Sequence, residues 1–416
     1  MDKRVFGEYE RGRHDRTEQL RSDLHNFLIG EIENAKLSLA EISRDELKHF
    51  ISIKTNRFLV GSQIAVSALD VAALNEQMVH ELIGFGPLET LLQDAQVNDI
   101  LVNGPNNIYV ERRGVLEKTR LRFSDDEHVL RVIRRILAPL GRRVDETRPM
   151  VDARLPDGSR VNAIIPPLAI DGPCISIRKF RADALKAEDL LAYGTLDTRL
   201  LDFLSKAVSA RCNIIVSGGT GAGKTSLLNM LSQFIHEAER IVTIEDAAEL
   251  RLRHPHVVRL ETRPPNIDGE GEIVARDLLR NSLRMRPDRI VIGEIRSDEV
   301  IDLVQAMNTG HDGCMSTVHA NTPADAVLRF ELLAGLAGFQ GSEDALRRMI
   351  CSGVDLIVQI SRLASGKRRI TSVVEVVNIR DNRVVLNELF TYKPDSDSFA
   401  PGDSQPESPK LRKLLG

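Results

Sequence analysis

One segment of the sequence requires a strand, a tight loop and a helix in immediate succession. Residues 217–226 read SGGTGAGKTS and satisfy the pattern G-x-x-x-x-G-K-[ST] in full. The apolar run 214–216 before the segment is typical of a buried strand. Apolar residues with helical spacing come after it, at Leu227, Leu228, Leu231, Phe234 and Ile235. The chain must therefore contain an α/β domain built around this unit.

The glycines of this loop indicate phosphate binding. Glycine lets the backbone turn tightly enough to aim several N–H groups at phosphate oxygens, and the following helix adds its positive N-terminal end. Lys224 is expected to reach the β- and γ-phosphates, and Thr225 to supply a hydroxyl to Mg²⁺. The alternative is a glycine turn with an incidental lysine, and the flanking strand and helix count against it. The predicted nucleotide ligands are Gly218, Gly219, Thr220, Gly221, Ala222, Gly223, Lys224, Thr225 and Ser226.

The length of 416 residues suggests two or three domains. Composition and hydrophobic periodicity along the chain predict five regions. These are a helical region over 1–78, an α/β domain over 79–180, a connection over 181–198, a nucleotide domain over 199–394 and a disordered tail over 395–416. Within the nucleotide domain, alternating strands and helices predict a mainly parallel sheet. Its expected strands are 240–244, 257–260, 289–292, 315–318 and 356–360.

Composition limits the classes of function. Apolar residues make up 42% and aromatic residues 4%, which suits an α/β protein packed with aliphatic side chains. A formal net charge of −4 argues against a nucleic-acid partner, which usually requires a clear basic excess. No apolar run approaches the ~20 residues of a membrane span, so a cytoplasmic protein without direct membrane insertion is expected. The four scattered cysteines are expected to be small core residues: Cys174, Cys212, Cys314 and Cys351.

Carboxylates follow two of the expected strands. Glu245, Asp246 and Glu249 come after the strand at 240–244, at the strand ends where open α/β sheets bind their ligands. A second strand ends in Gly293 and Glu294, which resembles a Walker B strand with glycine where many such strands carry aspartate. Carboxylates at these positions can hold Mg²⁺ and orient a water for phosphoryl transfer. For Glu245 and Asp246, a solvated strand end or a helix cap is the alternative.

Two histidines border the expected strand at 315–318. His319 follows the strand directly, so its imidazole is expected to sense the γ-phosphate by hydrogen bonding. His311 precedes the strand and is a weaker candidate for nucleotide contact, since a lone histidine is more often structural.

With these motifs in place, the sequence resembles the secretion and pilus assembly ATPases of the type II and type IV secretion superfamily. The branch it is most similar to is the CpaF type, the motor of tight-adherence (Tad, or Flp) pili, in which glycine at the position of Gly293 is usual. The resemblance spans roughly residues 80 to 380. It rests on the phosphate loop and on the segments 84–88, 155–160, 245–249, 283–288 and 310–321.

The resemblance implies a small α/β (PAS-like) N-terminal domain, a RecA-like P-loop ATPase domain with a mainly parallel sheet, and a hexameric ring. It implies that ATP and Mg²⁺ are bound, that Glu249 positions the attacking water and that Glu294 acts on Mg²⁺ or its water shell, although these two roles can be reversed. It further implies a partner, an inner-membrane platform protein, through which the motor powers pilus assembly, with or without retraction.

The resemblance also gives a role to arginines of the first domain. Related motors bring arginines of this domain to the nucleotide, where a guanidinium compensates developing charge. The candidates are Arg154, Arg160 and Arg178. Surface ion pairs are the alternative interpretation for each of them.

Two other classes of function remain open at this stage. A nucleic-acid motor of the RecA or helicase type shares the phosphate loop, but the acidic balance and the scarce aromatic residues count against it. A nucleotide-gated assembly switch would bind ATP with little turnover, and the carboxylates Glu249 and Glu294 count against that. A GTPase is disfavoured because the sequence has no N-K-x-D motif.

Overall fold

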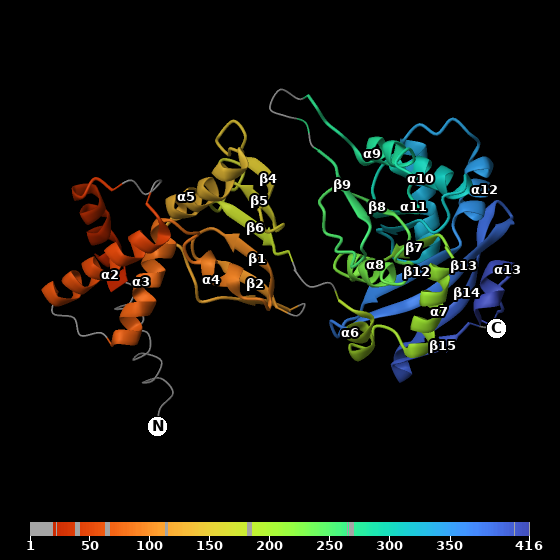
Figure 1. Ribbon diagram of the computed structural model, residues 1–416, viewed down its shortest axis with the longest axis horizontal. Helices are drawn as coiled ribbons and strands as arrows, with labels where there is room; N and C mark the ends of the chain where they lie inside the picture. The colour runs from red at the N-terminus through yellow and green to blue at the C-terminus, as the bar shows by residue number, and fades with distance from the viewer. Residues whose placement is uncertain are drawn as a thin grey trace. The chain divides into compact units, whose positions relative to one another are not determined.

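The computed structural model of the chain describes residues 20–21, 23–37, 42–62, 67–112, 115–180, 185–263, 265, 270–402 and 404–415. The chain forms two compact units, the first ending at Phe180 and the second beginning at Arg181 (Figure 1). Each unit contains one β-sheet, so the fold is mixed α/β, as the sequence predicts. No helix among the described residues is both long enough and apolar enough to span a membrane.

The first unit begins with helices. A helix over 23–34 buries Leu24 and Leu28 completely, on the apolar face that the sequence predicts. It is followed by α2 (Arg44–Gly61) and α3 (Ala68–Leu82). Helix α2 starts at a capping box, in which the side chain of Ser43 accepts a hydrogen bond from the backbone N–H of Glu46. These helices share one buried cluster, so the N-terminal helices are confirmed.

The sheet of the first unit has six antiparallel strands in the order β3-β2-β1-β6-β5-β4. Helix α5 (Asp126–Leu137) presents an apolar face to this sheet, and α4 (Leu88–Gln93) and the 3₁₀ helix η1 (Ala138–Leu140) complete the unit. The strands are β1 (Val97–Asn103), β2 (Ile108–Arg112), β3 (Val115–Lys118), β4 (Met150–Arg154), β5 (Arg160–Ile164) and β6 (Cys174–Arg178).

The sheet of the second unit has nine strands in the order β15-β14-β13-β12-β7-β11-β10-β8-β9. The six strands from β12 to β9 are parallel, and β13, β14 and β15 extend the sheet antiparallel. The predicted mainly parallel sheet is confirmed. The strands are β7 (Ile214–Ser217), β8 (Ile241–Glu245), β9 (Val257–Glu261), β10 (Arg289–Ile295), β11 (Met315–Val318), β12 (Leu356–Arg362), β13 (Arg368–Arg380), β14 (Arg383–Lys393) and β15 (Ser398–Pro401).

Helices cover both faces of this sheet. The central strand β7 sends Ile214 and Val216 into one buried cluster and Ile215 into another, as the alternation of side chains along a strand requires. The first cluster contains residues of α6 (Ala187–Ala192), α7 (Thr198–Ser209), α8 (Lys224–Ser232) and α13 (Pro409–Leu415). The second contains residues of α9 (Ala275–Ser282), α10 (Glu299–Asn308), α11 (Pro323–Leu336) and α12 (Glu343–Gly353).

The expected connection over 181–198 is partly wrong. From residue 185 onward, the described part of this segment packs into the second unit, where Leu190 and Leu196 are buried in the same cluster as α7 and α8. Burial of these apolar side chains is favourable, and the nucleotide domain provides the apolar surface against which they pack. The segment is therefore part of that domain's core.

The expected disordered tail over 395–416 is also wrong for the described residues. The tail adds the 3₁₀ helix η2 (Pro394–Ser396), strand β15 and helix α13. Leu411 is fully buried in the core of the second unit. The buried carboxylate of Glu375 accepts hydrogen bonds from the backbone N–H groups of Glu407 (2.8 Å) and Ser408 (2.6 Å). One deeply buried leucine and one buried carboxylate outweigh the polar composition on which the prediction depended.

The packing of α13 predicts the effect of removing the Leu411 side chain. Leu411→Ala should lower the free energy of unfolding of the second unit by about 2–4 kcal/mol, because it leaves a cavity in a closed core. The exposed Lys413→Ala, two residues away on the same helix, is the matched control and should change stability by less than about 0.5 kcal/mol. Urea unfolding followed by circular dichroism measures both. Equal stability of the two variants would contradict the packed tail.

Candidate active site

The phosphate loop connects the buried strand β7 to helix α8, as predicted. A side chain at Gly218 would place its Cβ 2.4 Å from the carbonyl oxygen of Ile360 on β12, so only glycine fits there. Gly223 has φ = +102° directly before the first turn of α8, a conformation that favours glycine. These two positions fix the path of the backbone around the loop. Thr225 and Ser226 then lie, half-buried, in the first turn of α8, where helix N–H groups point outward.

Lys224 is the buried cation of this loop. Its residue is 8% exposed, and its Nζ donates hydrogen bonds to the carbonyl oxygens of Gly218 (2.9 Å) and Gly219 (3.1 Å). Burial lowers the pKa of the ammonium group, and nearby Glu294 opposes that shift. The charge of Lys224 is thus held inside the curve of the loop, where phosphate oxygens can replace the carbonyl partners.

The parallel register brings three strand ends to this loop. Ser217 at the end of β7 is paired with Val318 at the end of β11, and on the other side of β11 the ends of β10 and β8 follow. Since all four strands run in the same direction, residues just beyond their carboxyl ends lie along one edge of the sheet. Glu245, Glu294 and His319 lie at this edge.

His319 lies between the loop lysine and the carboxylate at the end of β10. Its Nε2 is 3.2 Å from Lys224 Nζ and 2.8 Å from Glu294 Oε1. Desolvation is the main cause that lowers the pKa of His319, Glu294 raises it, and Lys224 and Arg296 lower it further. The imidazole therefore favours its neutral form. Nε2 of the neutral imidazole can accept a hydrogen bond from Lys224 Nζ, whereas Glu294 Oε1, although 2.8 Å from the same nitrogen, has no hydrogen-bond partner among the described residues.

Arg296 is a site residue that the sequence reasoning missed. Its Nε donates to Glu294 Oε2 at 2.7 Å, and its Nη1 donates to Asp246 Oδ2 at 3.0 Å. The guanidinium therefore joins Glu294, near the end of β10, to Asp246, which directly follows β8 and is exposed. The available signal was the spacing: Arg296 is two residues beyond Glu294, and i, i+2 residues of an extended chain share one side.

The structure explains why glycine precedes Glu294. Gly293 and Glu245 lie at neighbouring strand ends, and a Cβ on Gly293 would be 3.0 Å from Cγ of Glu245. Glu245 cannot easily withdraw, because its Oε2 accepts hydrogen bonds from the backbone N–H groups of Glu249 and Leu250, both at 2.7 Å. A carboxylate from β8 thus fills the space that an aspartate at 293 would need.

Glu245 is an unusual carboxylate in its own right. Burial raises its pKa to about 7, while the N–H groups of Leu250 and Glu249 act in the opposite direction. Its Oε1 is buried and has no hydrogen-bond partner among the described residues. Through the same two N–H groups, Glu245 fixes the backbone that carries Glu249, whose residue is half-buried. Glu245 therefore fixes the position of the Glu249 backbone, from which the Glu249 side chain extends.

The structure does not bring His311 to the loop. His311 precedes β11, whereas the loop lies at the opposite, carboxyl end of that strand. Its carbonyl oxygen accepts a hydrogen bond from Cys314 Sγ at 3.0 Å, and its Nδ1 is buried without a hydrogen-bond partner among the described residues. The expectation of nucleotide contact by His311 is thus not met within this unit, because a four-residue strand separates it from the phosphate loop.

The three predicted arginines lie together in the first unit. Arg154 is paired with Arg160 across β4 and β5, and Arg160 is paired with Arg178 across β5 and β6. Cross-strand partners present their side chains on the same face, so the register aligns three positive residues in a row. Arg178 Nε donates to Asp99 Oδ1 at 3.2 Å. Sequence spacing could not have shown this alignment, because it depends on strand register.

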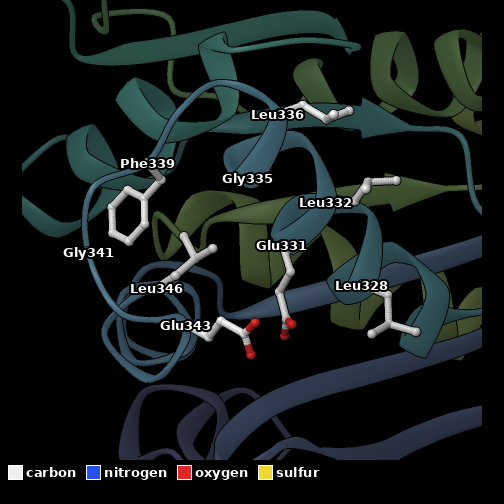
Figure 2. A pocket seen from close by; sticks show the side chains of 9 residues that line it. All are labelled: Leu328, Glu331, Leu332, Gly335, Leu336, Phe339, Gly341, Glu343 and Leu346. Carbon is white, nitrogen blue, oxygen red and sulfur yellow. The ribbon is translucent and has the colours of Figure 1, made fainter.

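A groove lies elsewhere on the second unit, between α11 and α12 (Figure 2). It has a volume of about 460 Å³, and Leu328, Leu332 and Leu336 line it along α11. Its two acids, Glu331 and Glu343, are both paired with Arg347, at 3.0 Å each. None of the phosphate-loop residues borders this groove, so it is separate from the site described above.

The contact between Gly293 and Glu245 predicts a rescue. Gly293→Ala should lower the free energy of unfolding by about 1–3 kcal/mol, because the methyl group overpacks a held side chain. In a Glu245→Ala background the same change should cost less than about 0.5 kcal/mol, because the obstructing Cγ is gone. Denaturant unfolding of the four proteins in this double-mutant cycle gives the coupling. Additive effects would show that the two positions do not compete for space.

The raised pKa of Glu245 predicts a pH dependence of stability. Between the ordinary carboxyl pKa and about 7, the folded state binds more protons at this residue than the unfolded state, so stability falls as the pH rises. Relative to Glu245→Gln, the wild-type protein should lose about 1.4 kcal/mol for each pH unit across this window, a few kcal/mol in total. Unfolding measured from pH 5 to 8 tests this. Parallel profiles for the two proteins would contradict the buried, raised carboxyl.

Comparison with known proteins places the chain in a family. The sequence profile of the family described as "Type II/IV secretion system protein" matches residues 81–394. A putative conjugal transfer protein of Mycobacterium tuberculosis (strain ATCC 25618 / H37Rv) is 40% identical over 299 residues, which cover 70% of this chain and 84% of that protein. The conjugal transfer protein TrbB of Rhizobium radiobacter is 31% identical over 311 residues, 73% of this chain and 91% of that protein.

Among solved structures, the VirB11 ATPase of the Brucella suis type IV secretion system is 28% identical, with a TM-score of 0.38 over 69% of this chain and 91% of that one. The family profile covers most of both units, from the end of α3 to the end of β14. The chain belongs to the type II/IV secretion system protein family.

Proposed function

We propose that this chain is a Mg²⁺-dependent ATPase that hydrolyses ATP to power a secretion or pilus machine. The observation that carries the proposal is the convergence of Lys224, His319 and Glu294 at one sheet edge, with contacts of 3.2 Å and 2.8 Å. A cation in the loop, a carboxylate near the end of strand β10 and an imidazole between them are groups that suit phosphoryl transfer to water.

The oxygen donors at this edge fit a hard divalent cation. The hydroxyl of Thr225, the carboxylate of Glu294 and the unpartnered buried Oε1 of Glu245 are the ligand types that Mg²⁺ prefers, directly or through its water shell. When bound, Mg²⁺ supplies charge compensation to the β- and γ-phosphates. Thr225 and Glu294 are the residues assigned to hold it.

The remaining residues divide the work. Lys224 exchanges its carbonyl partners for phosphate oxygens, and the N–H groups from Gly219 to Ser226 bind the phosphates. Glu249, on the backbone that Glu245 fixes, orients the attacking water. His319, between Lys224 and Glu294, senses the γ-phosphate by hydrogen bonding. Arg296 holds the carboxylates of Glu294 and Asp246 in place through a hydrogen bond to each.

We further propose that the active site is completed in a homo-hexameric ring. The register aligns Arg154, Arg160 and Arg178 in a row of guanidinium groups, which are suited to bidentate contact with phosphate. Supplied to the nucleotide by rigid-body motion of the first unit, these arginines stabilise developing charge on the transferred phosphoryl group. Hydrolysis would then drive the first units against the ring of second units.

The finer assignment rests on the resemblance of the sequence motifs, Gly293 among them, to the CpaF-type motors of Tad (Flp) pili. Two relatives are named as conjugal transfer proteins, which supports a role in a secretion machine. We propose work on an inner-membrane platform protein that adds pilin subunits to such a pilus, or to related type II secretion machinery. The protein would then be cytoplasmic and held at the inner membrane through this partner.

The proposal predicts how the rate of hydrolysis depends on assembly. ATP hydrolysis per subunit, measured with Mg²⁺ as a function of protein concentration, should rise as the ring forms, because arginines from the first unit complete the site. Glu294→Gln should lower the rate about 10²-fold or more. The exposed Glu237→Gln keeps the same charge change away from the site and should hydrolyse ATP like the wild type.

A rate per subunit that stays constant from monomer to ring would contradict completion of the site by assembly. Stimulation of the rate by single-stranded DNA would favour the nucleic-acid motor instead.

A further inference from the structure

The hairpin between β12 and β13 packs directly against the phosphate loop. Ile360 near the end of β12 gives the loop its closest neighbour, since its carbonyl oxygen would be 2.4 Å from a Cβ on Gly218. The hairpin then turns at Gly366 and returns into β13 with the basic run Lys367, Arg368 and Arg369. Nothing in the family's loop motif points to this hairpin, which follows the loop by more than a hundred residues in the sequence.

Arg368 contacts the loop itself. Its Nε donates a hydrogen bond to the carbonyl oxygen of Gly221 at 3.1 Å. Its Cδ lies close to the next glycine, 3.2 Å from the point where a Cβ on Gly223 would stand. The aliphatic stem therefore packs on the last glycine before Lys224, while the guanidinium lies on the middle of the loop. Both contacts are with residues that carry phosphate-binding N–H groups.

The orientation of Arg368 is fixed from the other side of the hairpin. The neighbouring Arg369 is buried, and its guanidinium binds the carboxylate of Asp397 (2.9 Å and 3.1 Å) and the carbonyl oxygen of Tyr193 (2.9 Å). Successive residues of a strand point to opposite faces, so anchoring Arg369 in the core turns Arg368 toward the loop. The folded tail, through Asp397, is part of this anchor.

A second positive residue lies opposite Arg368. Arg362 on β12 is its cross-strand partner, so the two side chains are on the same face of the hairpin. The register therefore places two guanidinium groups on this face of the hairpin. The phosphate loop is adjacent to this face, and it is where the proposed function brings a polyphosphate.

We propose that Arg368 is a positioning residue of the nucleotide site. By its hydrogen bond to Gly221, the guanidinium fixes the peptide between Gly221 and Ala222 and thereby orients the N–H groups of the loop. By its charge, it attracts the polyphosphate that the loop binds. The inference rests on the proposed function, because it assumes that the loop binds ATP and ADP. It adds a residue from a different part of the chain, which would act on affinity more than on the chemical step.

The test measures nucleotide affinity without turnover. In full-length protein carrying Glu294→Gln, isothermal titration calorimetry gives Kd values for Mg²⁺-ATP and Mg²⁺-ADP. Arg368→Met keeps the stem on Gly223 and removes the donor and the charge, so it should raise both Kd values about tenfold or more. Arg368→Lys restores the charge and should recover part of the affinity. The adjacent Lys367→Ala, whose amine is 3.4 Å from Asp397, removes one positive charge from the same hairpin and should leave both Kd values within about twofold.

Steady-state kinetics separates a positioning role from a loss of folding. In protein that retains Glu294, Arg368→Met should raise KM about tenfold with kcat changed by less than about threefold, whereas a misfolded fraction would lower kcat at constant KM. Equal Kd values for the parent and Arg368→Met would overturn the inference while leaving the proposed function intact. Equal losses for Lys367→Ala and Arg368→Met would also overturn it, because they would reduce the effect to general charge. If the wild-type protein binds neither nucleotide, both the inference and the proposed function fail.

Discussion

The parallel register of β7, β11 and β10 is the constraint on which the site of the second unit depends. It brings Lys224, the first residue of α8, into contact with His319, which follows β11, and through His319 near to Glu294 at the end of β10. Each group is partly removed from water, which strengthens the attraction between ammonium and carboxylate and holds the imidazole neutral.

Steric exclusion between neighbouring strands, as well as hydrogen bonding, determines where the carboxylates of the site lie. Glu245 occupies the volume beside Gly293, so the end of β10 offers only Glu294, and β8 supplies the second carboxylate. Because burial raises the pKa of Glu245 to about 7, this carboxyl group gains or loses its proton near neutral pH. Two backbone N–H groups make the ionised form tolerable and at the same time place Glu249. Glu245 thus affects both the space available beside Gly293 and the charge of the site.

The sequence predicts local features of this protein well and register-dependent features poorly. The loop, its flanking strand and helix, and the five other parallel strands follow from apolar runs and glycine spacing, which local backbone energetics determines. The β13–β14 hairpin was missed, although Asp381 and Asn382 both have positive φ, which is typical of a two-residue hairpin turn. Arg368 and the link from Arg296 to Asp246 were missed because in each case the partner comes from a distant segment. Burial of Leu411 was hidden in a polar tail for the same reason.

We expect Lys224 and the groups around it to catalyse hydrolysis of the ATP that the loop binds. The most direct measurement is a single-turnover experiment: the assembled wild-type protein, in excess over radiolabelled ATP with Mg²⁺, is quenched at successive times, and bound ATP and ADP are separated. The account predicts that all bound ATP becomes ADP in one exponential phase, and that Lys224→Ala abolishes this phase. Recovery of intact ATP from a fully bound, assembled protein would contradict it and would make the chain a nucleotide-gated switch.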